Sequence, residues 1–185
     1  MFRATSFALL MLSVANPALA DEVTDTLSSA LQAYEDGDIK YAIEELDYAK
    51  QLLQAMSAQE LTSFLPEPPE GWTREIGESD MNAGLAFLGG GSAAEASYTD
   101  GTERVTLSIM ADNPMVAMFG GMISNAAIMG LKTHRVGREK FLYDDGELTG
   151  LIDGRIIVQA SGAEPEVMIP ILEAIDFNAL NDFGR

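Results

Sequence analysis

The sequence predicts an α+β protein in which an N-terminal helical hairpin is followed by an antiparallel sheet with two packed helices. Three observations predict this fold class. Apolar residues recur at helical spacing over residues 21–57, alternating runs separated by Asp-Gly turns fill residues 94–160, and further helical patterns begin at Pro114 and Pro165. The domains expected from these patterns are a hairpin at 21–57, a Pro-rich linker at 58–71 and an α+β domain at 72–185.

Residues 1–20 have the pattern of a secretory signal peptide. Arg3 supplies the positive start, an apolar block runs from Phe7 to Leu12, and Ala18 and Ala20 form the small-residue cleavage box. We therefore expect export to the periplasm with cleavage after Ala20. No cysteine follows the box, so neither a lipid anchor nor any other stable membrane anchor is expected.

The chain is acidic and has no cysteine. With 29 acidic against 11 basic residues, its formal net charge is −18. This charge argues against nucleic acid and anionic membranes as partners, because both attract positive protein surfaces. The lack of cysteine excludes disulfides, thiolate metal ligands and cysteine nucleophiles, so packing must supply the stability.

Two helices are predicted in the hairpin, the first over residues 21–35 and the second from Asp38. Gly37 suits the left-handed conformation that ends a helix, and so short a turn gives an antiparallel pair. The apolar residues at helical spacing are Val23, Leu27, Ala30, Leu31 and Tyr34 in the first helix, and Ile39, Ala42, Ile43, Leu46, Ala49, Leu53 and Met56 in the second.

Part of the hairpin resembles a repeat family. The stretch from Tyr34 to Asp38, with Ala42-Ile43 and the run from Leu46 to Ala49, resembles the middle of a tetratricopeptide repeat. The resemblance implies the geometry of a helical hairpin. It occurs once, and a lone repeat has no neighbour to cover its apolar side, so we expect it to dock elsewhere.

The linker is predicted from its prolines. Pro66, Pro68 and Pro69 cannot continue a helix and favour an extended chain. Trp72 follows at once, and we expect this single tryptophan to anchor the start of the α+β domain by covering an edge of its core.

The β pattern begins weakly and then becomes regular. Residues 84–88 form a possible strand, and Gly89-Gly90-Gly91 a loop that lacks the spacing and the lysine of a phosphate-binding loop. An Asp-Gly turn at Asp100-Gly101 predicts a hairpin between strands at 94–98 and 103–110. Further strands are expected at 132–138, 139–143, 147–152 and 155–160.

A strand-to-helix joint lies at the centre of the domain. The strand from Glu103 breaks at residues 111–114, where Asp112 or Asn113 is expected to cap a helix and Pro114 suits its first turn. This helix is predicted to end at Gly130. A final helix is predicted from Pro165 to about residue 175, followed by a packed tail with Phe177 and Leu180.

The order of elements resembles two groups of secreted domains. Together with the start at Pro68-Pro69-Glu70-Gly71-Trp72, it resembles the PsbP and Mog1 proteins. Gly71-Trp72 and the strand end from Ser108 to Asp112 also resemble uncharacterised small periplasmic proteins of bacteria. The resemblance implies the α+β topology and carries no shared active site.

One side of the central helix is rich in methionine. Met115, Met118, Phe119, Met122, Ala126 and Met129 fall on one side of a helical wheel. We expect this side to pack on the sheet, because the thioethers share it with an aromatic ring. The alternative is an exposed Cu(I) site, since thioethers favour that ion.

The opposite side of the same helix is predicted to bind a partner. It is small or apolar and uncharged, although a solvent-facing helix usually carries charges and glycine is costly inside a helix. The occupant is expected to be the protein's own hairpin, which is favoured, or a second protein chain. The candidate partner-binding residues are Gly120, Gly121, Ser124, Asn125 and Ile128.

No residue pattern predicts catalysis. His134 is the single histidine, so one chain cannot build a zinc site from several imidazoles. The acids at 144, 145, 147 and 153 accompany Asp-Gly turns and lack the spacing of a calcium loop. We therefore expect a non-enzymatic periplasmic interaction or binding module without cofactor or metal. The alternative is a binder of small ligands or Cu(I).

Overall fold

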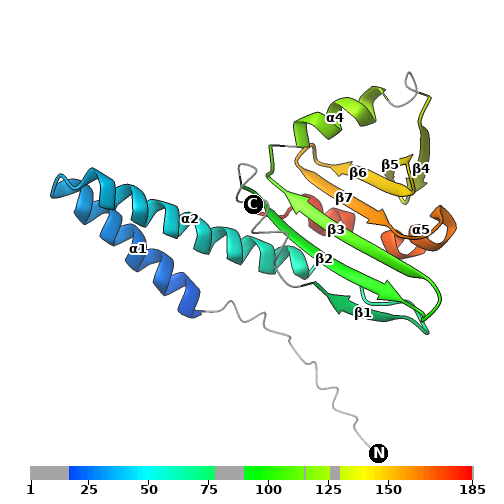
Figure 1. Ribbon diagram of the computed structural model, residues 1–185, viewed down its shortest axis with the longest axis horizontal. Helices are drawn as coiled ribbons and strands as arrows, with labels where there is room; N and C mark the ends of the chain where they lie inside the picture. Colours follow the sequence, from blue (N-terminus) through cyan, green and yellow to red (C-terminus); the bar gives the residue numbers. More distant parts are fainter. Residues whose placement is uncertain (1–16, 78–89, 115, 126–129, 185) are drawn as a thin grey trace, which may run out of the picture. The chain divides into compact units, whose positions relative to one another are not determined.

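The computed structural model describes residues 17–77, 90–114, 116–125 and 130–184 (Figure 1). The chain divides into two compact units, residues 1–53 and 54–185. We call them the hairpin and the sheet unit. The predicted α+β class, with a helical hairpin followed by an antiparallel sheet and small helices, is confirmed.

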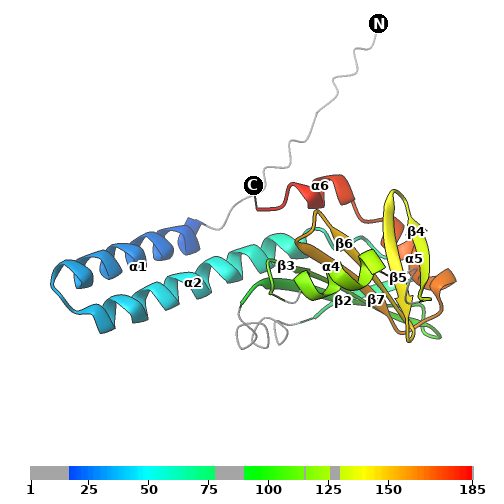
Figure 2. The same cartoon turned by 90° about the horizontal axis from the view of Figure 1, so that it is seen from above.

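The hairpin consists of α1 (Pro17–Glu35) and the first part of α2 (Ile39–Thr62). The two helices run antiparallel side by side in both Figure 1 and Figure 2. Gly37 has the predicted left-handed conformation, with φ of 82°. Asp38 caps α2, because its Oδ1 accepts a hydrogen bond of 3.1 Å from the backbone N–H of Tyr41.

The sheet unit contains one seven-stranded antiparallel sheet in the order β1-β2-β3-β7-β6-β5-β4. Every strand pairs with its neighbour in sequence except at the centre, where β3 lies beside β7 with Thr106 opposite Ser161. The strands are β1 (Thr73–Ile76), β2 (Ser92–Thr99), β3 (Arg104–Ala111), β4 (Lys132–Val136), β5 (Glu139–Asp144), β6 (Glu147–Ile152) and β7 (Ile156–Ser161). β1 was not predicted, and the possible strand at 84–88 lies outside the described residues.

Helices cover both faces of this sheet. On one face α5 (Pro165–Glu173) and α6 (Phe177–Asn181) pack on alternate strand residues such as Leu107, Phe141 and Val158 to form the core. On the other face α4 (Val116–Asn125) contacts β6. Figure 2 shows α4 and α6 on opposite sides of the sheet. That second face also carries polar side chains, including Glu95, Ser108, Gln159 and Thr149 in one register row.

The segment expected to be a linker is instead part of the sheet unit. α2 continues to Thr62, and Leu61 and Leu65 are buried in the core of the sheet unit. The buried phenol of Tyr98 donates a hydrogen bond of 2.8 Å to the carbonyl of Pro66. α2 thus ends at Thr62, beyond the predicted end of the hairpin and four residues before Pro66, and the chain that follows is held by a core that sequence pattern alone does not show.

The strand-to-helix joint has contacts that the sequence did not predict. Asn113 is buried, and its Nδ2 donates a hydrogen bond of 2.6 Å to the carbonyl of Gly90. Asp112 has a positive φ of 55°, and its carboxylate accepts 3.2 Å hydrogen bonds from Arg155. The guanidinium of Arg155 also donates a hydrogen bond to the carbonyl of Phe183 and stacks over the ring of that residue. Both side chains thus tie the joint to distant segments, and Arg155 is the residue that sequence reasoning did not single out.

Candidate functional site

The residues predicted to bind a partner lie on α4 or beyond its described end. Gly120 is half-buried, and a Cβ there would approach Leu151 of β6 at 3.3 Å, so this glycine faces the sheet rather than away from it. Gly121 is exposed, and a Cβ there would meet no atom within 4 Å. Ser124 and Asn125 are helical, with side chains outside the described set, and Ile128 lies outside the described residues. Partner binding at this surface stays a prediction.

The methionine side of the same helix is only partly described. Met115 and Met129 lie outside the described residues, and of Met118 and Met122 only the helical backbone is described. Phe119 is half-buried near β5 and β6. The choice between packing and Cu(I) binding therefore stays a prediction.

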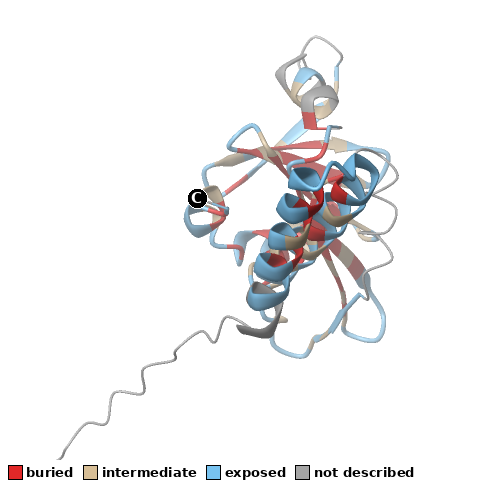
Figure 3. Ribbon diagram, turned by 90° about the vertical axis from the view of Figure 1, so that its left-hand side faces the viewer, coloured by how far each residue is buried: buried red, intermediate tan, exposed pale blue. Residues whose placement is uncertain are grey.

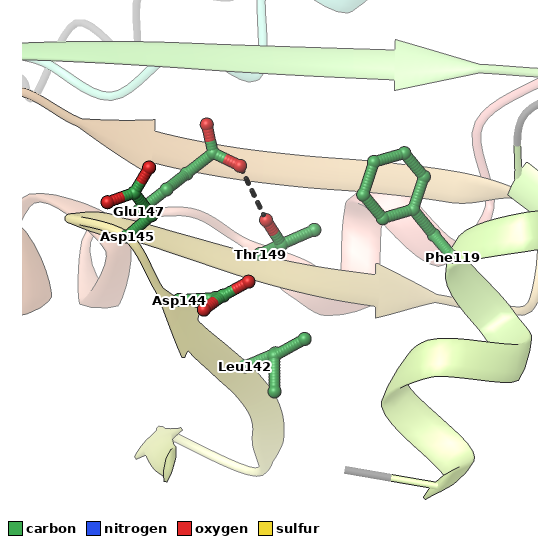
Figure 4. Close-up of a pocket in the computed structure, with 6 residues that line it drawn as sticks. All are labelled: Phe119, Leu142, Asp144, Asp145, Glu147 and Thr149. Carbon is green, nitrogen blue, oxygen red and sulfur yellow. Dashed lines mark hydrogen bonds between the residues drawn. The ribbon is translucent and has the colours of Figure 1, made fainter. Parts of the chain in front are cut away.

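A small acidic pocket opens beside Phe119 (Figure 4). Its volume is about 250 Å³, and it is lined by Phe119, Leu142, Asp144, Asp145, Glu147 and Thr149. Glu147 Oε1 accepts hydrogen bonds from the hydroxyl of Thr149 and from Nε2 of Gln159, which fixes its carboxylate on the polar sheet face. Within the described part of the chain, no group of three or more His, Cys, Asp or Glu side chains is arranged to hold a metal ion.

The histidine has a structural neighbour. His134 lies on β4, and its ring meets that of Tyr143 edge to face with centroids 5.7 Å apart. This contact fits an edge-strand residue packed on its cross-strand neighbours.

The hairpin is held together by small side chains. Ala30 and Ala33 of α1 and Ala42 and Ala49 of α2 are buried where the two helices meet, with Val23 and Thr26 at the start of the seam. Alanine brings two helix axes close together because it adds little bulk between them. Such a seam has no room for the larger apolar residues of the same helices.

The larger apolar residues are exposed instead. Leu31 is 59% exposed, Tyr34 65% and Ile43 54%, and Figure 3 colours the outward sides of the hairpin helices as exposed. Among the described residues, the exposed large hydrophobics number nine on the hairpin and one, Ile76, on the sheet unit. The hairpin ones are Leu27, Leu31, Tyr34, Ile39, Tyr41, Ile43, Leu46, Tyr48 and Leu53.

Seven of these nine share one side of the hairpin. At 100° per residue, Glu22 and Tyr48 lie on one flank of the alanine seam in their respective helices. The phenol of Tyr48 donates a hydrogen bond of 2.6 Å to Glu22 Oε1, so the flank of α1 that carries Glu22 lies beside the flank of α2 that carries Tyr48. The opposite flanks therefore also adjoin, and we call them the outer face. It consists of Leu27, Leu31 and Tyr34 from α1 with Ile39, Ile43, Leu46 and Leu53 from α2.

The electrostatics of the two sides differ. We call the flank that carries Tyr41 and Tyr48 the tyrosine flank. There a hydrogen bond to Glu45 raises the pKa of Tyr41, and a hydrogen bond to Glu22 raises the pKa of Tyr48. The outer face has apolar side chains in both helices, with Lys50 between Leu46 and Leu53 as its single charged residue. The tyrosine flank is thus polar and acidic, and the outer face is apolar.

Sequence reasoning identified half of this site. The apolar residues of the second helix predict that it needs a cover, but helical spacing alone places the apolar residues of each helix in a single stripe. The structure separates them into a buried row of small residues and an exposed row of large ones. Side-chain size, sorted by helical position, is the sequence feature that distinguishes the two rows.

Comparison with known proteins adds no relative: no family model, curated protein or solved structure matches the chain. The likeness to PsbP and Mog1 proteins therefore stays a prediction. Of the described helices, none combines the length and apolar character needed to cross a bilayer.

Proposed function

We propose that this protein is a non-enzymatic periplasmic interaction module that binds a protein partner through the outer face of its hairpin. The single observation that carries the proposal is the gathering of seven large, half-exposed apolar residues on one side of two helices. Contiguous apolar patches of more than a few hundred Å² are rare on monomeric soluble proteins and mark interaction sites.

The side chains of the outer face suit the binding of another protein rather than catalysis. Its seven side chains are aliphatic or aromatic, and the polar groups along the same two rows are the phenol of Tyr34, the hydroxyl of Thr24 and the amine of Lys50. A helical hairpin with such a face can bury it against another helical surface, as amphipathic helices do in grooves and bundles.

Residues 1–20 support the periplasmic part of the proposal. Sequencing the N-terminus of protein recovered from the periplasm is expected to give Asp21-Glu22-Val23 as its first residues. Recovery of the uncleaved chain from the cytoplasm alone would contradict export.

The interaction itself is tested by photo-crosslinking in the cell. A benzophenone amino acid at Leu46 is expected to give covalent adducts, because that position lies in the centre of the outer face. The same amino acid at Tyr41, which is 46% exposed on the other flank, is the matched control and is expected to give none. Equal adduct yields at both positions, or no adduct at either, would refute the proposal.

A small-ligand binder is the second candidate, and the acidic pocket beside Phe119 is the observation that favours it. Its volume of about 250 Å³ is slightly below the roughly 300–1,000 Å³ of typical ligand sites, which is why it ranks second. Mass spectrometry of native protein from the periplasm is the test, and a bound small molecule that Glu147→Gln releases would support this candidate.

A further inference from the structure

Each hairpin helix carries two parallel rows of core-type positions. In α2 the outer row is Ile39, Ile43, Leu46, Lys50 and Leu53, and in α1 it is Thr24, Leu27, Leu31 and Tyr34. Both rows advance by alternate steps of four and three residues. The inner rows of small residues advance in the same way, as in Val23, Thr26, Ala30 and Ala33.

Alternate steps of four and three are the spacing of helices that pack lengthwise on one another. This spacing keeps one row facing a partner helix along its whole length, as in coiled coils and four-helix bundles. A helix inside a four-helix bundle contacts two neighbours and therefore needs two such rows. Within the hairpin, the inner row of each helix packs against the other helix, and the outer row does not.

We propose that the outer face binds the outer face of a second copy of this chain, so that two hairpins form a four-helix bundle. The inference rests on the proposed function and names its partner. A two-fold pairing uses the same surface on both copies, so the two pairs of outer rows meet each other.

The size of the face suits this occupant. Seven large side chains that are each about half exposed offer on the order of 700 Å² of apolar surface, close to the roughly 800 Å² that each partner buries in a standard interface. The sheet unit is a poorer match. Ile76 is its single exposed large hydrophobic among the described residues, so it has little apolar surface to offer in return.

Charge also favours a second copy. Two chains of net charge −18 repel each other, so they can associate only through a surface free of acids. The two outer rows contain no Asp or Glu, whereas Glu22 and Glu45 lie beside the tyrosine flank. A basic partner would instead be recognised by the acidic flank.

Lys50 is expected to select one alignment of the two paired hairpins. A single lysine at a core position of a helical bundle lowers stability but selects one alignment and one number of chains, because its amine must reach water or an acceptor. Lys50→Leu is therefore expected to strengthen self-association at least tenfold and to add species larger than the dimer.

Analytical ultracentrifugation of the full mature chain tests the proposal. The wild type is expected to show a monomer–dimer equilibrium over a concentration series. Leu46→Gln and Ile43→Gln should each raise the dimer dissociation constant at least tenfold, while the control Tyr41→Gln should change it less than threefold. Circular dichroism of the monomeric variants should show retained helix content, which separates lost pairing from unfolding.

Because the chain has no cysteine, single-cysteine variants add an independent measurement. Under mild oxidation, Leu27→Cys, Ile43→Cys or Leu46→Cys should give disulfide-linked dimers in at least one case, and Tyr41→Cys should stay monomeric. A wild type that is monomeric at every concentration, with no dimer from any outer-face cysteine, overturns the proposal.

The outcomes distinguish this inference from the proposed function. Adducts at position 46 that contain a different protein, with a monomeric purified chain, refute the second copy and leave the interaction module standing. Adducts within one chain refute both, because they show the sheet unit as the occupant.

Discussion

The hairpin and the sheet unit distribute side-chain size in opposite ways. In the sheet unit the innermost residues are large, with Tyr98, Phe141 and Met168 fully buried. In the hairpin the innermost residues are alanines, and leucine, isoleucine and tyrosine lie outside. A sheet covered by helices encloses enough volume to hide bulk, whereas two helices have only one seam. Among the described residues, the sheet unit therefore buries its large side chains within itself, whereas the hairpin exposes most of its large side chains.

The sharpest way to break this comparison is to remove one large side chain from the buried core of the sheet unit and one from the exposed outer face of the hairpin. Phe141→Ala in the sheet core is expected to lower the unfolding free energy by about 3–5 kcal/mol, since it removes a buried ring. Leu46→Ala on the outer face should change it by less than about 0.5 kcal/mol at concentrations where the chain is monomeric. Urea unfolding followed by circular dichroism gives both values, and equal losses would remove the contrast.

Tyrosine ionisation distinguishes the units by pH. Burial raises the pKa of Tyr98 to about 12, above its usual value of 10.0, although Arg74 partly opposes the shift. The folded state thus holds this proton more tightly than the unfolded state does. Its contribution is complete below pH 10 and is lost as the pH rises through 12. We expect roughly 2–3 kcal/mol of stability to disappear over that window.

The measurement is urea unfolding at pH 8 to 12 for the wild type and Tyr98→Phe. The variant should lack this part of the alkaline loss, while Tyr41→Phe, an exposed tyrosine of the hairpin, should keep it. Identical pH profiles for wild type and Tyr98→Phe would contradict a buried, protonated phenol.

Adding bulk to the alanine seam tests the hairpin half of the comparison. Ala49 is 1% exposed, and Ala49→Leu is expected to force the helices apart at a cost of about 1–3 kcal/mol. Ala55→Leu, at an exposed position of the same helix, is the matched control. Hydrogen exchange of the α1 amides should quicken in the first variant only, and unchanged protection would mean that the seam tolerates large residues.

The smallest expected effect is at the start of α2. Asp38→Ala removes the side-chain oxygen that caps the helix at Tyr41 and should cost about 1 kcal/mol. Asp38→Asn keeps an acceptor and should recover most of that loss. Exchange rates of the first α2 amides report the effect, which should not reach the sheet unit.

Much of the fold follows from local patterns in the sequence. Asp100-Gly101 and Asp145-Gly146 lie in the turns where hairpins were predicted, and the glycines have positive φ. The helix at Pro165 likewise begins where proline suits a first turn. These features depend on neighbouring residues alone, so a single sequence contains them.

The missed features depend on distant residues. β1 has only four residues and forms because Thr73 to Ile76 pair with β2. Asn113 donates a hydrogen bond to the carbonyl of Gly90, and this contact was missed because Gly90 is distant in sequence. In the hairpin, periodicity showed that the helices were amphipathic but not which apolar row would meet the other helix. That choice depends on fitting two surfaces, which favours alanine over leucine at the closest approach.

The central pairing of β3 with β7 has a consequence for how the sheet assembles. The other strand pairs join neighbours in sequence, and all of them except β1 and β2 close through connections of two to four residues. β3 and β7 can pair only after the chain between them, which contains α4 and three strands, has formed a large loop. Closing a large loop is entropically unfavourable before its contacts form, so non-local pairings slow folding. We therefore expect the pairing of β3 with β7, which joins the strands β1–β3 to the strands β4–β7, to be a late step in the folding of the sheet unit.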